Sequence, residues 1–204
     1  MSTWKTKAIK FGSEVFDLIA FLVLVFGIIL FIRFFVATPY TVLGASMMPN
    51  FAEKDWIIVE KGTQRFSSFD RGDVIVFVPD GKNLPYIKRV IGLPGETVLV
   101  KNEKVYICSE NTPAGSLVTT SLGLNCEELK EEYLPQYTMT IASCGKEEFE
   151  VEGGYFVMGD NRGRTTDSLC CFGIQCYPGA NYLVKSPDLI GKVRVRLYPD
   201  FGKF

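Results

Sequence analysis

The longest hydrophobic stretch of the chain lies near its N-terminus. Every residue from Leu18 to Ile32 is apolar or glycine, and after Arg33 the apolar run resumes and ends at Ala37. A run of about 20 apolar residues is long enough for a helix to cross the hydrocarbon core of a bilayer. The pattern therefore predicts a transmembrane helix over residues 15–37 behind a short tail, residues 1–14.

The lysines in front of this run predict its orientation. Lys5, Lys7 and Lys10 precede the run, whereas beyond Arg33 the next basic residue is Lys54. Short segments rich in Lys and Arg stay on the cytoplasmic side of a membrane. We therefore expect a single-pass protein of the plasma (inner) membrane, with a cytoplasmic N-terminus and the rest of the chain outside the cytoplasm.

Two other interpretations of the run compete with a membrane anchor. A buried core helix is one, but a helix that is apolar on all sides is unusual in a chain of 204 residues. A cleaved signal peptide is the other, because it also combines a basic start with an apolar run. The run is longer than a typical signal-peptide core, and Pro39 closely follows the only small residues nearby, Ala37 and Thr38. These observations favour the anchor.

The chain after Thr38 and Pro39 shows the pattern of a β protein. Short runs rich in β-branched and aromatic residues alternate with Gly, Pro, Asn and Asp. No long amphipathic helical pattern separates them, which favours a mostly antiparallel β domain over a parallel α/β sheet. The predicted strands are Tyr40–Leu43, Trp56–Glu60, Asp73–Val78, Tyr86–Ile91, Thr97–Lys101, Lys104–Cys108, Gly154–Met158 and Lys192–Leu197.

One segment of this part differs from its surroundings. Residues 109–152 are rich in glutamate and lack a sustained apolar period. We expect a small inserted subdomain there, like a cap, within a β domain formed by residues 38–108 and 153–204. The expected fold class is mostly β, with a single N-terminal transmembrane helix.

The charge and composition of the chain exclude several classes of function. Lys and Arg number 22 and Asp and Glu number 23, so the clustered basic excess that nucleic acid binding requires is missing. The chain contains no histidine, which removes the commonest general base and the commonest metal ligand. A nucleophilic enzyme with this sequence would need a lysine or a carboxylate as its base.

The cysteines predict disulfides. Without histidine, and with no CxxC pair, the usual zinc sites cannot be built. The predicted topology places every cysteine outside the cytoplasm, where disulfides persist. We expect at least one disulfide involving Cys170, Cys171 or Cys176, with free structural thiols as the alternative. The six cysteines are Cys108, Cys126, Cys144, Cys170, Cys171 and Cys176.

Four sequence blocks follow one another behind the apolar run: Gly44–Pro49, Arg71–Phe77, Tyr86–Glu96 and Gly154–Arg162. Each block alone is a weak motif. In this order behind an N-terminal membrane helix, the four closely resemble the conserved boxes of type I signal peptidases. The resemblance runs through most of residues 15–168, is interrupted by the insertion, and weakens afterwards.

The resemblance implies a membrane-bound serine endopeptidase that removes signal peptides from exported preproteins. In this family the implied nucleophile is Ser46 and the implied general base is Lys88, with the main-chain N–H of Ser46 as one oxyanion donor. Cleavage would follow small residues of the Ala-x-Ala type, and no cofactor or metal is implied. The expected partners are signal peptides, membrane lipid and nearby translocation machinery, and no nucleic acid.

The resemblance also implies supporting residues. The Thr165 hydroxyl would hydrogen-bond Lys88, and Asp160 would pair with Arg89, although a turn-capping role for Asp160 is the alternative. Asn161 would belong to the same supporting loop. Residues near the substrate or the membrane would be Met48, Pro49 and Tyr86.

Two positions depart from the family pattern. Some members carry a serine that completes the oxyanion hole where this chain has Gly44, so a second donor must come from elsewhere. An arginine is common where this chain has Leu169, so a supporting ion pair is expected to be missing.

The residues themselves bear on the proposed pair. Lys88 shares a predicted strand face with Tyr86 and Val90, and apolar surroundings lower the pKa of a lysine. Taken alone, Ser46 reads as a turn residue and Lys88 as a solvated lysine. Two further hypotheses stay open: a related self-cleaving regulatory Ser-Lys protease, and a non-catalytic, membrane-anchored β module that binds partners.

Overall fold

The computed structural model divides the chain into two units, Met1–Thr38 and Pro39–Phe204. Each is described by itself. Side chains in residues 2–13 and at residues 34–35 are not described. The structure describes the backbone of residues 2–62, 68–110, 112, 118–142, 144–173, 176–177 and 179–203.

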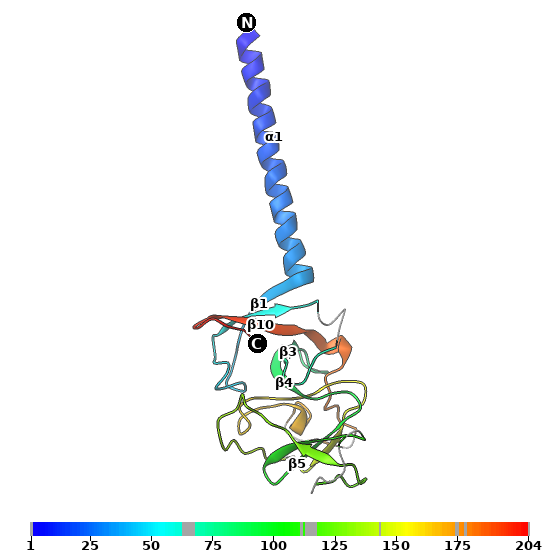
Figure 1. Cartoon of the computed structure of the whole chain (residues 1–204). Coiled ribbons are helices and arrows are strands. Elements are labelled where there is room, and N and C mark those ends of the chain that lie inside the picture. The colour runs from blue at the N-terminus through cyan, green and yellow to red at the C-terminus, as the bar shows by residue number, and fades with distance from the viewer. Residues whose placement is uncertain are drawn as a thin grey trace. The chain divides into compact units, whose positions relative to one another are not determined.

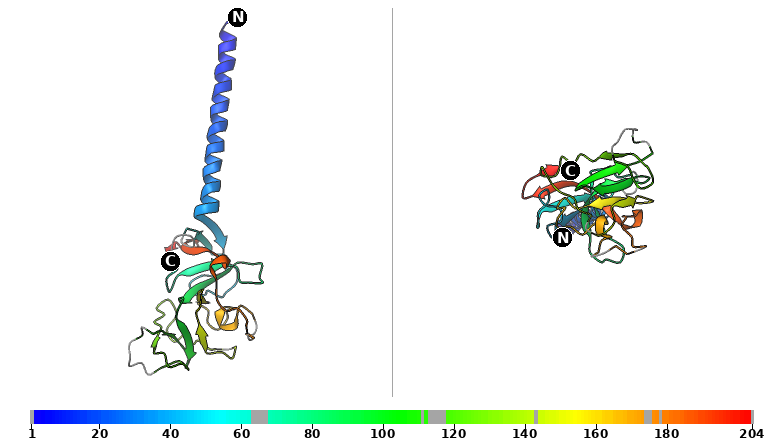
Figure 2. Two further views of the ribbon diagram at one scale, coloured as in Figure 1. Left: turned by 90° about the vertical axis from the view of Figure 1, so that its right-hand side faces the viewer. Right: turned by 90° about the horizontal axis from the view of Figure 1, so that it is seen from below.

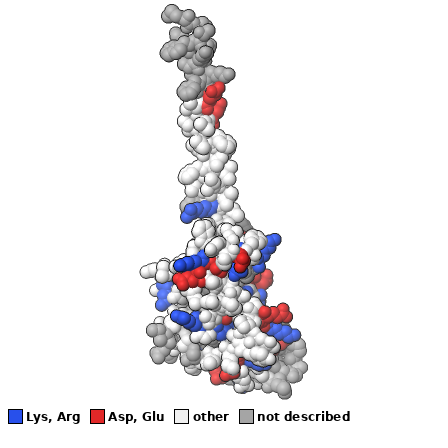
Figure 3. All heavy atoms as spheres, turned by 90° about the vertical axis from the view of Figure 1, so that its left-hand side faces the viewer, with Lys and Arg blue, Asp and Glu red and all other residues white. Residues whose placement is uncertain are grey.

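The first unit is a single helix. The α-helix α1 (Ser2–Phe31) continues into a π-helical turn, η1 (Ile32–Val36), and its stretch Glu14–Phe31 is long and apolar enough to cross a membrane. Figure 3 shows a length of this helix with uncharged side chains only. Those side chains are almost all exposed, which argues against a buried core helix.

The helix begins earlier than predicted. The backbone of residues 2–14 is helical, because no proline interrupts the sequence before Pro39 and nothing in the basic segment prevents a helix. Chain extension then starts at β1 (Ala37–Thr41), three residues before the predicted strand at Tyr40.

The second unit contains two antiparallel sheets, which confirms the predicted fold class. The larger has the strand order β1-β2-β10-β3-β4-β9, with β11 paired to β10. Figures 1 and 2 show β1 and β10 at one end of the unit and β5 at the other. The strands of the larger sheet are β1, β2 (Trp56–Glu60), β3 (Val74–Phe77), β4 (Tyr86–Gly92), β9 (Phe156–Met158), β10 (Leu189–Tyr198) and β11 (Gly202–Lys203).

The smaller sheet includes strands from residues 109–152. Its order is β7-β6-β5-β8, and two of its four strands come from the segment that was expected to be a separate cap. These two short strands pair with the hairpin that precedes them. The strands are β5 (Thr97–Lys101), β6 (Lys104–Cys108), β7 (Cys126–Glu128) and β8 (Glu148–Glu150).

Strand β4 lies next to the edge of the larger sheet, between β3 and the edge strand β9. From Lys88 to Gly92 every one of its residues is buried. Ile75 and Val90 pack in one core cluster, and Val74 and Val76 in another. Lys88 lies in this buried part of β4 and is therefore shielded from water.

The basic residues of β10 are paired with carboxylates. Salt bridges join Lys192 to Asp73, Arg194 to Glu60 and Arg196 to Asp55. Two of these cations, Lys192 and Arg196, are largely withdrawn from solvent, with side-chain exposures of 12% and 21%. The pairs tie β10 to the chain segments beside it.

All six cysteines form disulfides, which confirms the expected involvement of the C-terminal three. Cys144–Cys170 joins two segments 26 residues apart, and Cys171–Cys176 closes a short loop. The third bridge, Cys108–Cys126, links β6 to β7. Disulfides thus fasten the smaller sheet to itself and to the segment after Ser168.

Candidate active site

Ser46 lies in the turn between β1 and β2, here called the Ser46 turn (residues 42–51). Met47 and Phe51 anchor this turn, because both are almost fully buried against side chains of the larger sheet. Gly44 has a φ of +83°, a backbone conformation that costs glycine little and other residues more. The turn is therefore fixed on both sides of the serine.

Lys88 points from β4 toward this turn. Its Nζ lies 2.7 Å from Ser46 Oγ and 2.9 Å from the carbonyl oxygen of Ile87. The ring centre of Tyr86 lies 5.5 Å from the same nitrogen. The structure thus brings together the two residues that the sequence predicted as nucleophile and base.

The surroundings of Lys88 change its acidity. Only 3% of the residue is exposed, and this burial lowers the pKa of Lys88 from 10.5 to about 8, although the negative charges of Asp167 and Asp160 oppose the shift. Burial disfavours the charged ammonium because the protein replaces its water shell. A neutral amine beside the hydroxyl is therefore accessible near physiological pH.

A groove of about 840 Å³ opens over the pair. It runs between residues 40–46 on one side and residues 84–88 on the other, and apolar side chains such as Leu43 and Ile87 line it. Tyr86 lines the groove as well, whereas Met48 and Pro49 do not. Met48 is exposed outside it.

The loop Gly159–Arg162 contacts the main chain of the Ser46 turn. Asn161 donates its main-chain N–H to the carbonyl oxygen of Ser46 at 3.0 Å and its side-chain amide to that of Ala45 at 2.9 Å. A side chain at Gly159 would collide with Thr165 Oγ1 and with the Ser46 carbonyl oxygen. Glycine permits this close approach, which explains why the loop can touch the turn.

Asp160 pairs with Arg89, as the family resemblance implied. Arg89 donates from Nε and Nη2 to the two carboxylate oxygens at 2.8 and 2.7 Å, and from Nη1 to the carbonyl oxygen of Gly72. Asn50 also donates to Asp160. Because the carboxylate bonds to other elements, Asp160 is more than a turn cap.

The expected hydrogen bond between Thr165 and Lys88 is not formed in this structure. Among the described residues, the buried Thr165 Oγ1 makes no well-formed hydrogen bond, although the hydroxyl lies near enough to Asp167 to favour its charge. Burial raises the pKa of Asp167, which accepts main-chain N–H groups of Gly159 and Leu169. No salt bridge to Asp167 occurs in the described part of the chain, consistent with leucine at position 169.

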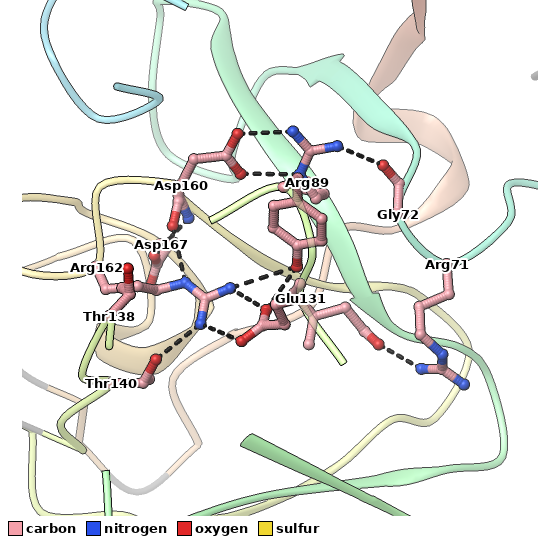
Figure 4. Close-up of polar contacts among 12 residues, drawn as sticks. Arg71, Gly72, Arg89, Glu131, Thr138, Thr140, Asp160, Arg162 and Asp167 are labelled. Atoms are coloured by element: carbon pink, nitrogen blue, oxygen red, sulfur yellow. Dashed lines mark hydrogen bonds and ion pairs between the residues drawn. The ribbon is translucent and has the colours of Figure 1, made fainter. Parts of the chain in front are cut away.

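Sequence reasoning missed two residues around the supporting loop, Glu131 and Tyr133. Figure 4 shows Arg162 reaching Glu131, and the ring of Tyr133 lies 4.0 Å from the guanidinium carbon of Arg89. Both Glu131 and Tyr133 come from the segment predicted to be a cap. No short motif marks them, and Glu131 is one of many glutamates in this segment, so the sequence does not distinguish it from its neighbours.

The chain is similar in sequence to known signal peptidases. Signal peptidase I U of Bacillus subtilis is 29% identical over 206 residues, covering 98% of this chain and 96% of that protein. A signal peptidase I of Bacillus amyloliquefaciens is 34% identical over 168 residues, covering 82% and 84%. A crystal structure of an Enterococcus faecalis signal peptidase I, 27% identical, covers 62% of this chain and 97% of its own, with a TM-score of 0.33.

The family match extends through both units. Residues 15–198 fit the model of the family described as signal peptidase, peptidase S26. They include the apolar helix, the Ser46 turn, β4 and the supporting loop. The chain belongs to the signal peptidase family, peptidase S26.

Proposed function

We propose that this protein is a membrane-bound serine endopeptidase that removes N-terminal signal peptides from exported preproteins through a Ser46–Lys88 dyad. The carrying observation is the 2.7 Å distance between Lys88 Nζ and Ser46 Oγ, with the lysine buried and its pKa near 8. Family membership favours this function over a self-cleaving regulatory protease or a non-catalytic binding module.

The groove supports the following reaction. Ser46 Oγ attacks the scissile carbonyl carbon while Lys88 Nζ takes its proton, and the lysine then gives that proton to the leaving amine. Lys88 Nζ, neutral again, then deprotonates a water molecule, which hydrolyses the acyl-enzyme and frees Ser46. Within the described residues, the main-chain N–H of Ser46 donates no hydrogen bond, so it is available to the oxyanion.

The substrate lies extended in the groove, between residues 40–46 and 84–88. Such a peptide adds a strand to the exposed chain edges, and shallow pockets admit Ala-like side chains at the first and third positions before the cut. A specificity of the Ala-x-Ala type follows.

The apolar helix anchors the enzyme in the plasma membrane, next to the lipid and the translocation machinery that deliver its substrates. Lys5, Lys7 and Lys10 precede the apolar stretch, and this basic bias supports a cytoplasmic N-terminus with the catalytic unit outside. Three disulfides in that unit suit an oxidising compartment.

A peptide assay tests this function. Detergent-solubilised protein should cut a peptide containing Ala-x-Ala at one site, which mass spectrometry identifies, and Ser46→Ala should not cut it. Equal cleavage by Ser46→Ala would refute the dyad, and no cleavage by the parent protein would refute the proposed activity.

A further inference from the structure

The guanidinium of Arg162 is buried beside the candidate active site. Its side chain is only 1% exposed, and Nε donates to the carbonyl oxygen of Gly159 at 3.1 Å while Nη1 donates to Thr140 Oγ1 at 2.7 Å. A cation in this position requires a carboxylate, because an uncompensated buried charge is strongly unfavourable.

Glu131 supplies that carboxylate. Its two oxygens accept from Nη1 and Nη2 of Arg162, a two-bond arrangement that fixes orientation as well as charge. The glutamate side chain is itself only 13% exposed. The nearby Asp160 is already engaged by Arg89, so Glu131 is the salt-bridge partner of Arg162 in the described part of the chain (Figure 4).

This ion pair is connected to the Ser46 turn through one short loop. Arg162 holds the carbonyl oxygen of Gly159, and the intervening Asn161 holds the carbonyl oxygens of Ala45 and Ser46. A shift of Arg162 would therefore reach the Ser46 turn through the backbone of one short loop.

The segment that carries Glu131 is firmly attached. The carbonyl oxygen of Tyr133 accepts from Asn50 at 2.8 Å, and the main-chain N–H of Thr140 donates to the carbonyl oxygen of Glu103 at 2.9 Å. The first bond reaches the Ser46 turn and the second reaches the β5–β6 hairpin, so the glutamate is held from both sides.

We propose that Glu131 is a positioning residue of this peptidase: as the counter-ion of Arg162, it holds the Gly159–Arg162 loop against the Ser46 turn and so keeps Ser46 in register with Lys88. The proposal rests on the Ser46–Lys88 dyad. It assigns the glutamate-rich segment a part in the reaction although none of its residues lines the groove over the dyad.

The main test is Glu131→Gln, which keeps the shape and removes the charge. We expect kcat for peptide cleavage to fall roughly 10- to 100-fold, because small misplacements of a reacting group are costly. KM should stay within about threefold, because the groove is untouched. The matched control is Glu128→Gln, which removes a glutamate of the exposed Lys104–Glu128 pair and should leave both constants near those of the parent.

A double-mutant cycle shows whether Glu131 acts through Arg162. Arg162→Met should lower kcat, and adding Glu131→Gln to it should lower kcat no further, because the double variant buries no lone charge. This comparison holds even if Glu131→Gln alone does not fold. All variants are assayed well below their melting temperatures.

The outcomes separate the two proposals. A folded Glu131→Gln with the parent's kcat, a loss confined to KM, or a double variant much slower than Arg162→Met would overturn the positioning role and leave the dyad intact. Cleavage by Ser46→Ala at the parent rate would instead overturn the dyad, and the positioning role would fall with it.

Discussion

Lys88 Nζ lies 2.7 Å from Ser46 Oγ, and the lysine is almost fully buried at that point. A serine hydroxyl beside a charged ammonium cannot lose its proton to it, so the pair works only when the amine is neutral. The structure lowers the pKa of Lys88 to about 8, which makes the neutral form a substantial fraction in mildly alkaline conditions.

The first prediction concerns the pH dependence of cleavage. The rate should rise with pH through an apparent pKa near 8 and level off above it, because only the neutral amine of Lys88 accepts the proton of Ser46. A pH profile of kcat/KM with the Ala-x-Ala peptide measures this. A rate that is flat between pH 6 and 9 (about the range where this lysine changes charge) would contradict the assignment.

The second prediction sets activity against stability at position 88. Lys88→Met should lose about 100-fold or more in cleavage rate. The folded pKa of Lys88 lies below the ordinary 10.5, so the unfolded state binds more protons between pH 8 and 10.5 and the parent gains stability as pH rises through that window.

Burying the charged form of Lys88 lowers the free energy of unfolding of the parent. This cost is full below about pH 8 and amounts to roughly 3 kcal/mol. Lys88→Met removes it, so denaturant unfolding at pH 7 should show a more stable variant. The advantage should shrink toward pH 10.5. A variant that is less stable than the parent at pH 7 would show that burial of the charged lysine carries no such cost.

The third prediction concerns Thr165. A neutral Lys88 amine that accepts from Ser46 and donates to Ile87 has one N–H left, and the buried hydroxyl of Thr165 has no well-formed partner among the described residues. We propose that the two meet during the reaction. Thr165→Val should then lower activity roughly 10- to 100-fold.

The stability of the same variant should not fall. Valine removes a buried hydroxyl that has no well-formed hydrogen bond among the described residues, so the free energy of unfolding should stay constant or rise by about 1 kcal/mol. Thr165→Ser, which keeps the hydroxyl, is the matched control for activity. Parent-like cleavage by Thr165→Val would reduce the residue to a packing role.

The fourth prediction compares two disulfides. Replacing both Cys144 and Cys170 by serine should lower the free energy of unfolding by about 3 kcal/mol, because the bridge closes a loop of 26 residues. The matched pair Cys171 and Cys176 closes only five, and its removal should cost about 1 kcal/mol less. Thermal melts of the two double variants measure the order, and a reversed order would contradict the loop-entropy account.

The sequence predicted the dyad and most of the larger sheet because those signals are local. Four short blocks pick out the serine and the lysine that the structure brings together, and short runs rich in β-branched residues mark strands such as β2 and β5. The boundaries of β9 and β10 were less accurate, since β9 begins at Phe156 and β10 already at Leu189. Strand ends depend on pairing partners, which a single chain does not reveal.

The two outer strands of the second sheet, and the contacts that residues 109–152 make with the supporting loop, were beyond the same reasoning. Strands β7 and β8 have three residues each, too few to show a period, and they exist because β5 and β6 offer edges. Glu131 looks in sequence like its neighbour Glu132, yet only the former accepts from Arg162. That choice is made by tertiary packing.

The contacts made by residues 109–152 also limit how far this enzyme can be shortened. Deleting the segment would leave Arg162 without its carboxylate, Arg89 without the Tyr133 ring, and two cysteines without partners. Three of these groups, Arg162, Arg89 and Cys108, are buried, so water cannot replace the lost partner without opening the core. A shortened peptidase made from this chain must therefore keep residues 109–152. Attempts to shorten it should begin at exposed surface turns instead.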